Sequence, residues 1–218
     1  MKIEWRHLKL TMTFSTPLCG GVPRNDDLVK TWIETRAPAK APEGAQTLTE
    51  VVDERLETTD PVDADDPMSK LWVGFSKDDT GLFVRGGSVR AHLKDCAHTL
   101  APDFKAAKPP IMNFRKKFID RIYVAEDRVY LRNGDGTVNA ATDHRDAAMQ
   151  VITPLGPRTC LKRVDQVHPC WLECTIQLLE GNGINRDAVV ACLDYGAVHG
   201  FNQDRSLQYG RYAYELSE

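Results

Sequence analysis

Glycine and arginine residues gather near the C-terminal end of the chain in a pattern that suits phosphate binding. Residues 200–214 read GFNQDRSLQYGRYAY. Tyr212 and Tyr214 supply the alternation of a closing strand, but such a strand needs none of the glycine and charged residues before it. Guanidinium groups and exposed backbone N–H groups bind phosphate oxygens, whereas the alternative is a solvated turn before an edge strand. The residues that suit a phosphate-binding loop are Gly200, Asp204, Arg205, Ser206, Gly210 and Arg211.

A second glycine-rich stretch begins a predicted helix. VRGGSVRAHLKD, residues 84–95, places two glycines and Ser88 at the helix start, with Arg85 before it and Arg90 in its first turn. Unpaired N–H groups at such a start form a natural phosphate site, and the two arginines strengthen this interpretation. The alternative is that Ser88 only caps the helix.

The cysteine and histidine residues do not indicate a metal site. Cys170 and Cys174, with His168 nearby, lie in a strand pattern, where residues four apart are about 13 Å from each other and cannot share a zinc ion. Cys96 and His98 do not complete such a site, and no P-loop, dinucleotide or Ser-x-x-Lys pattern occurs. We therefore predict structural cysteines, no metal and no cofactor.

Composition predicts a soluble globular protein. The 218 residues are 42% apolar and 27% charged, and no stretch approaches the roughly 20 apolar residues of a membrane span. The N-terminus MKIEWRHLKL has no signal-peptide pattern, and six cysteines without such a signal favour reduced thiols. The sequence predicts a cytoplasmic protein that does not contact a membrane.

An acidic segment hides a basic body. The net charge is -3, but residues 41–67 carry nine acids and one base. Outside this segment 27 basic and 22 acidic residues remain, and residues 105–132 hold eight bases against three acids. This asymmetry is typical of a protein that meets nucleic acid on one face, and an ordinary solvated basic face is the alternative.

Periodicity predicts the elements that must position these residues. Alternation and helical spacing of apolar residues, with Asn185 as the cap of the last helix, define them. The expected elements are a strand at 3–14, a short helix at 27–36, a hairpin at 71–86, a helix from Ser88 to Leu100, a hairpin at 118–132, a bend into a strand at 152–164, a strand at 170–181, a helix at 186–200 and a strand at 208–216.

This order predicts an α+β fold. Strand, helix, hairpin, strand, helix and strand match the ferredoxin-like plan, an antiparallel sheet with two helices on one face, which RNA-recognition domains also have. We expect one domain over residues 1–218. Within it, residues 37–70 form a large, acidic, exposed insertion after the first strand, and residues 133–150 form a second, polar insertion.

Several of these segments together resemble the RAMP superfamily, the repeat-associated proteins of CRISPR effector complexes. FVRGGSVRAHLK is similar to a family motif of Pro-Gly-Ser-Ser, an apolar residue, Arg-Gly and a helix, with Arg85 in place of the proline and Ala91 in place of the glycine. GFNQDRSLQYGRY is similar to the glycine-rich loop near the family's C-terminus, and STPLCGG to the turn after its first strand. ITPLGPRTCLKRVDQVHPCWLECTIQLL is similar to its later bend, although Cys170 stands where a glycine usually follows the proline.

The resemblance implies an RNA-binding backbone subunit. Such subunits polymerise along a guide RNA, so the implied partners are guide RNA, other CRISPR effector subunits and further copies of this chain. The acidic composition of residues 41–67 leaves open whether this arm contacts RNA or a protein. The candidate RNA-binding residues are Arg85, Gly86, Gly87, Ser88, Arg90, Lys116, Lys117, Arg158, Arg205, Ser206, Tyr209 and Arg211.

Two other functions are compatible with the same resemblance. One is a type III-like endoribonuclease that cuts target RNA with an aspartate in the loop after the first strand, where Asp26 and Asp27 lie, and with Mg²⁺ in that case. Asn25 or Asp26 is alternatively an ordinary helix cap, and we favour a scaffold over an enzyme. The other is a viral or mobile-element relative that interferes with assembly.

Overall fold

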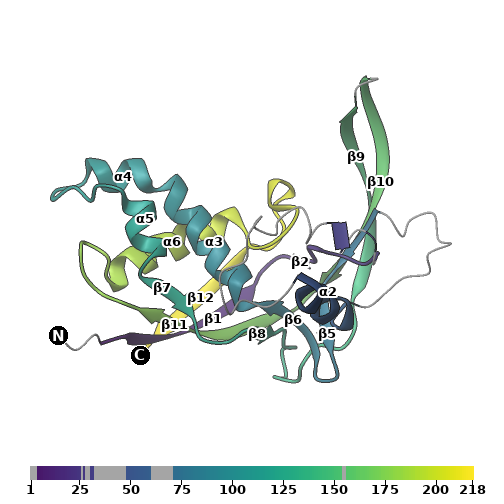
Figure 1. Ribbon diagram of the computed structural model, residues 1–218, viewed down its shortest axis with the longest axis horizontal. Coiled ribbons are helices and arrows are strands. Elements are labelled where there is room, and N and C mark those ends of the chain that lie inside the picture. The colour runs from purple at the N-terminus through teal and green to yellow at the C-terminus, as the bar shows by residue number, and fades with distance from the viewer. Residues whose placement is uncertain (1–3, 26, 28–29, 32–47, 60–70, 154–155) are drawn as a thin grey trace. The chain divides into compact units, whose positions relative to one another are not determined.

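The chain forms two compact units (Figure 1). A computed structural model describes residues 4–25, 27, 30–31, 48–59, 71–153 and 156–218. Unit 1 comprises Met1–Leu18, Phe83–Asn139 and His168–Glu218, and unit 2 comprises Cys19–Leu82 and Ala140–Val167. The organisation as one domain with two insertions remains a prediction.

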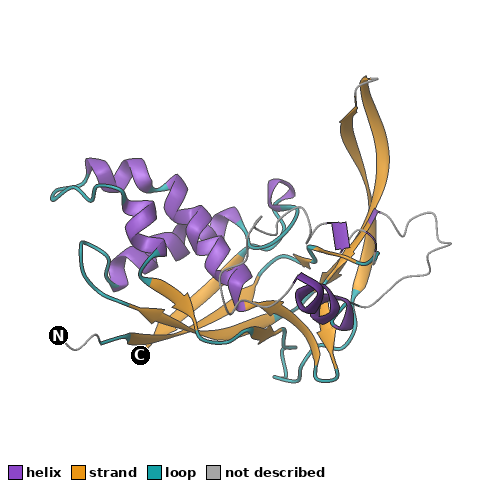
Figure 2. Ribbon diagram, viewed as in Figure 1, coloured by secondary structure: helices purple, strands orange, loops and turns teal. Residues whose placement is uncertain are grey.

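Unit 1 contains the predicted ferredoxin-like fold. Its four-stranded sheet has the order β12-β1-β11-β7, and every neighbouring pair is antiparallel. One helix, α3, precedes β7 in the chain and another, α6, follows β11, and Figure 2 shows both on the same face of the sheet. The elements are β1 (Arg6–Phe14), α3 (Gly86–Thr99), β7 (Ile122–Val124), β11 (Trp171–Leu178), α6 (Arg186–His199) and β12 (Tyr212–Ser217). The α+β prediction is therefore confirmed.

Alternation along β1 decides which face of the sheet is covered. Leu8, Leu10, Met12 and Phe14 are buried, whereas the residues between them are exposed or half-buried. The register pairs Leu8, Leu10 and Met12 with three buried residues of β11, namely Ile176, Cys174 and Leu172. A strand of period two therefore gives one face to the helices and leaves the other polar.

The two helices bury apolar faces of helical spacing. The buried residues are Gly86, Val89, His92, Leu93, Cys96 and Ala97 of α3, and Ala188, Val189, Cys192, Leu193 and Gly196 of α6. The predicted Asn185 cap is confirmed, because its side-chain oxygen accepts the Ala188 N–H at 3.0 Å. The predicted start of α3 at Ser88 is wrong: the helix begins at Gly86, with Arg85 at the N-cap and no side-chain cap.

Gly196 lets α6 approach its neighbours closely. A Cβ atom there would lie 2.4 Å from the Tyr212 hydroxyl and 2.6 Å from His92 Nε2, whereas a Cβ atom at Gly87 of α3 would meet nothing within 4 Å. We expect Gly196→Ala to lower the free energy of unfolding by about 1–3 kcal/mol through overpacking. Gly87→Ala is the matched control and should be neutral or stabilise by up to about 1 kcal/mol. Urea denaturation of both variants measures this, and equal effects would contradict the packing.

Both predicted hairpins are wrong in detail. In the first, β4 (Trp72–Gly74) pairs with β3 (Val22–Pro23) and with β10 (Gly156–Val167). The turn instead joins β5 (Ser76–Asp78) to β6 (Gly81–Arg85). In the second, Phe118 belongs to α5 (Phe114–Ile119), because its ring packs with Phe114, which stacks on Phe104 of α4 (Ala101–Ala106) at 3.7 Å. β7 then pairs with β11, and β8 (Arg128–Tyr130) pairs with β6.

Unit 2 is built on a long antiparallel ribbon. β9 (Asp143–Thr153) and β10 (Gly156–Val167) pair in register from Thr153↔Gly156 to Asp143↔Gln166. Part of the polar segment 133–150 is therefore a strand. This unit also contains β2 (Leu18–Cys19), at its boundary, and α2 (Leu48–Glu57), in the acidic segment. In the described part of the chain, no helix has the length and apolar character needed to cross a bilayer.

A buried ion pair lies at the base of this ribbon. Arg24 donates to Asp165 Oδ2 at 3.0 Å, and the Trp72 indole N–H donates to Asp165 Oδ1 at 2.6 Å. The guanidinium groups of Arg24 and Arg163 lie over the Trp72 ring, 4.7 and 4.9 Å from its centroid. The Asp165 and Arg24 side chains are only 4% and 11% exposed, so their opposite charges compensate each other in a buried pair.

Candidate functional site

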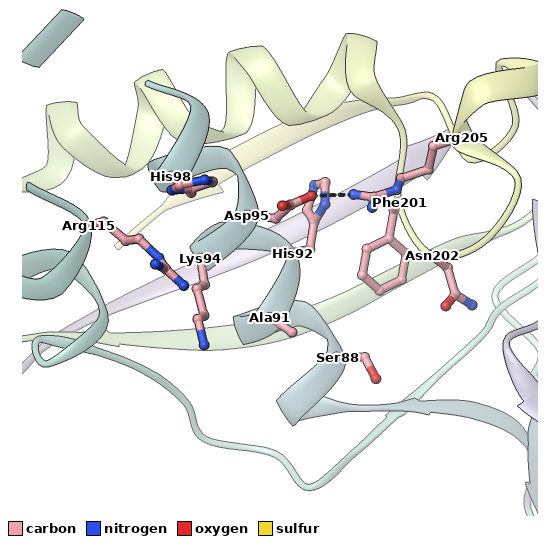
Figure 3. Close-up of a pocket in the computed structure, with 10 residues that line it drawn as sticks. All are labelled: Ser88, Ala91, His92, Lys94, Asp95, His98, Arg115, Phe201, Asn202 and Arg205. Atoms are coloured by element: carbon pink, nitrogen blue, oxygen red, sulfur yellow. Dashed lines mark hydrogen bonds and ion pairs between the residues drawn. The ribbon is translucent and has the colours of Figure 1, made fainter. Parts of the chain in front are cut away.

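A hollow of about 450 Å³ in unit 1 brings the two glycine-rich stretches together (Figure 3). Ser88 comes from the first stretch and Arg205 from the second, and both line this hollow. The lining residues are Ser88, Ala91, His92, Lys94, Asp95 and His98 of α3, Arg115 of α5, and Phe201, Asn202 and Arg205 of the loop before β12.

The two glycines of the C-terminal loop serve its closure. Gly200 and Gly210 have φ values of 90° and 70°, which favour glycine. A Cβ atom at Gly210 would lie 2.2 Å from the Phe201 carbonyl oxygen, and the Phe201 N–H donates to the Gly210 carbonyl at 2.8 Å. The Gly210 N–H donates to the Pro17 carbonyl at 3.0 Å. These glycines therefore shape the loop and place Arg205 toward α3.

Arg205 joins this loop to α3. Its guanidinium donates to Asp95 Oδ2 at 2.6 Å, and His199 Nε2 lies 3.6 Å from the same oxygen. Although partial burial raises the pKa of Asp95, the hydrogen bond and charge of Arg205 outweigh it and leave this pKa below its usual value. Arg205 is thus held at the rim of the hollow by an ionised carboxylate.

The start of α3 is exposed at Gly87 and Ser88, next to residues that contact Asp127. The Gly86 N–H donates to the Asp127 carbonyl at 2.8 Å, so Gly86 is part of the packing, while Gly87 and Ser88 are exposed. Arg85 pairs with the Asp127 carboxylate at 3.1 Å. Exposed first-turn N–H groups form a favourable site for an anion.

Arg90 fastens α3 to the segment between α5 and β7. Its guanidinium donates to the Ile119 and Ile122 carbonyls, at 2.8 Å in each case, and lies 4.2 Å from the Tyr123 ring centroid. These donors are engaged within the protein, so Arg90 has a structural role here.

Basic residues extend from this hollow along the helices. Lys94 and Arg115 are exposed and make no ion pair with any described residue. A neighbouring hollow of about 660 Å³ shares Arg115 and adds Lys105 and Lys116. Of the residues that line the two hollows, one is acidic, namely Asp95. We name this surface the cationic groove and define it by Ser88, Lys94, Lys105, Arg115, Lys116 and Arg205.

His92 forms a buried wall of the groove. Its Nε2 lies 2.9 Å from the Tyr212 hydroxyl, and its ring packs edge-to-face against Phe201 at 5.3 Å. Burial, with a smaller effect of the Arg205 charge, lowers the pKa of His92 to about 4. The ring is therefore neutral at physiological pH and keeps α3, the loop and β12 packed together.

The pKa of His92 predicts a pH dependence of stability. Between pH 6.5 and about 4 this histidine is protonated in the unfolded state but stays neutral in the folded state, so the free energy of unfolding decreases as the pH falls through this range. The expected decrease is about 3 kcal/mol. His92→Gln removes the titrating group and should flatten the dependence, as measured by urea denaturation across this range. The same slope in both proteins would contradict this environment for His92.

The other predicted residues lie around or apart from the groove. Ser206 is exposed and Tyr209 half-buried in the C-terminal loop, and the Arg211 N–H donates to Thr16 Oγ1 at 2.9 Å. Lys117 is half-buried on α5. Arg158 is exposed on β10 and therefore belongs to unit 2.

Of the two candidate catalytic aspartates, the structure describes one. Asp27 is exposed in helical conformation, and its carbonyl accepts the Thr31 hydroxyl at 2.8 Å. Asp26 lies outside the described residues. Among the residues that are described, no group of three or more His, Cys, Asp or Glu could hold a metal ion.

Several lining residues were not predicted as site residues. Lys94 and Asp95 follow Ser88 and Ala91 on the same side of α3, so helical spacing from Ser88 could have identified Lys94. Arg115 belongs to the basic run 105–132. Phe201 and Asn202 lie inside the quoted loop but carry no charge, and composition alone gave no reason to single them out.

Comparisons with known proteins give structural similarity alone. No protein-family model matches the chain, and no curated protein matches its sequence. A chain of the type III-B Cmr-beta complex bound to cognate target RNA is similar over 99% of this chain, with 8% identity and a TM-score of 0.45; this chain spans 61% of its length. A chain of a type IV-B CRISPR complex is similar over 97% of this chain and 90% of its own, with 10% identity and a TM-score of 0.44.

Proposed function

We propose that this chain is an RNA-binding subunit of a CRISPR-type ribonucleoprotein effector complex. One observation carries the proposal: two glycine- and arginine-containing stretches meet at one cationic groove. Asp95 and Arg205, which join them, are 110 residues apart in the sequence. A fold that brings such distant basic and glycine-rich segments to one surface supports a shared anionic ligand.

The groove suits the backbone of a single strand. Lys94, Arg115 and Lys116 are exposed on two helices and can each contact a phosphate without reading a base. The exposed N–H groups at the start of α3 add donors for a further phosphate. RNA would thus bind across α3 and α5 with little sequence preference, as guide-RNA binding along a scaffold requires.

The assignment to a CRISPR complex rests on the RAMP-like motifs, which include Arg85, Ser88 and Arg205. In this proposal the bound strand is a guide RNA, and copies of the chain assemble along it with other effector subunits. In this proposal the protein acts as a scaffold that holds phosphates through cations and backbone donors.

The test is purification from a host that expresses the neighbouring genes, followed by sequencing of bound RNA. We expect RNA containing CRISPR repeat sequence, and a complex whose mass by light scattering increases with the length of the RNA. Unselected cellular RNA would contradict the guide-RNA assignment. A monomer at every RNA length would contradict assembly along the strand.

A further inference from the structure

Asp95 places a carboxylate among the cations of the groove. It lines the hollow of about 450 Å³, and its side chain is 44% exposed. Its Oδ2 atom accepts the hydrogen bond from Arg205, whereas its Oδ1 atom accepts none from any residue that the structure describes. The pKa of this carboxyl lies below its usual value, so the group stays ionised and can only accept hydrogen bonds. Asp95 therefore offers an accessible acceptor to a ligand in the hollow.

The chemistry of this acceptor differs from that of the cations around it. A carboxylate repels phosphate groups, so it does not contribute to phosphate binding. The ribose of RNA, however, carries a 2′-hydroxyl that can donate a hydrogen bond and that DNA lacks. Hydrogen bonds to an ionised acceptor are about twice as strong as those between neutral groups. The carboxylate therefore suits a ribose, while the cations suit phosphates.

The arrangement of charges in the hollow fits the order of groups along an RNA strand. Figure 3 shows Asp95 between Arg205 on one side and Lys94 and Arg115 on the other. A guanidinium has five N–H donors, so the bond from Arg205 to Asp95 leaves donors for a phosphate oxygen. When phosphates of one strand contact the cations on both sides, a ribose between them lies beside Asp95.

We propose that Asp95 accepts a hydrogen bond from a 2′-hydroxyl of the bound strand and makes the groove selective for RNA. The inference rests on the proposed function, because it requires a strand in the cationic groove. It adds specificity to that function, since the phosphate contacts of Lys94, Arg115 and Lys116 do not distinguish RNA from DNA. Asp95 is then a specificity-determining residue, and Arg205 holds its carboxylate in place.

The experiment measures the affinity of wild type, Asp95→Ala and Asp187→Ala for two single strands of the same sequence. One strand is RNA. The other carries fluorine in place of every 2′-hydroxyl, so it keeps the phosphates and the bases but cannot donate a hydrogen bond from its riboses. Wild type should prefer RNA. Asp95→Ala should reduce this preference by about 10-fold, the effect of one hydrogen bond to a charged group.

The ratio of the two affinities separates this role from a purely structural or electrostatic one. Removing a carboxylate strengthens the binding of both anionic strands, and loosening Arg205 weakens the binding of both, so neither effect changes the ratio. Asp187 is an exposed acid on α6 that lines neither hollow. Asp187→Ala is therefore the matched control and should keep the wild-type ratio.

Failure of this inference and failure of the proposed function are distinguishable. If wild type binds both strands equally, or if Asp95→Ala keeps the full preference, this role of Asp95 is wrong while strand binding in the groove stands. If wild type binds neither strand, the proposed function itself fails. If Asp187→Ala loses the preference to the same extent as Asp95→Ala, the effect is one of net charge and the assignment to Asp95 is overturned.

Discussion

Replacing Asp165 with alanine is expected to lower the free energy of unfolding of unit 2 by about 3–5 kcal/mol. Asp165 accepts hydrogen bonds from Arg24 and Trp72 and is nearly inaccessible to solvent. Burial raises the pKa of this carboxyl, although the bond from Trp72 and the charge of Arg24 favour its ionised form. Removing it takes the carboxylate from the Arg24 guanidinium, which is 11% exposed, and the acceptor from the Trp72 indole N–H. Hydrogen exchange of amides in β10 measures the loss.

The matched control is Asp146→Ala. Asp146 also pairs with an arginine, accepting from Arg163 at 2.7 Å, but its side chain is 42% exposed. Exposed pairs contribute at most about 1 kcal/mol, so this variant should change little. A similar loss in both variants would contradict the view that burial makes the Asp165 pair decisive for unit 2.

The sequence predicted those elements whose pattern is local. Alternation from Leu8 to Phe14 defines β1, and Asn185 defines the start of α6. The hairpin at 118–132 failed because Phe118 is held in a helix by its contact with Phe114. β9 was hidden because β10 is its only partner among the described strands, and its polar residues, such as Asp146 with Arg163, are satisfied across the ribbon.

The sequence identified the two segments that meet at the candidate site, but not the contacts that their side chains make. Glycine and arginine patterns indicated both stretches that meet at the groove. Whether an arginine faces a ligand or the protein depends on tertiary contacts, and the Arg90 bonds to Ile119 and Ile122 show this. The exposed cations Lys94 and Arg115 emerge only when α3 and α5 are placed side by side.

Neutralising the cationic groove is expected to weaken RNA binding strongly. The change is the triple variant Lys94→Ala, Arg115→Ala and Lys116→Ala, whose residues are exposed and make no ion pair with a described residue. Each lost phosphate contact lowers the steepness of the salt dependence by about 0.7 on a single strand, so three contacts remove about 2. If the two proteins bind RNA equally at 1 M salt, the triple variant should therefore bind about 100-fold more weakly than wild type at 0.1 M salt.

The direct measurement is a salt titration of single-stranded RNA binding by wild type, the triple variant and Lys9→Ala. Lys9 lies on the open face of the sheet in unit 1 and pairs with Glu173 at 2.9 Å, so it is a basic residue outside the groove. We expect the slope of log affinity against log salt to be reduced by about 2 in the triple variant and unchanged in Lys9→Ala. Equal slopes in wild type and the triple variant, or a loss confined to Lys9→Ala, would show that RNA does not lie in the cationic groove.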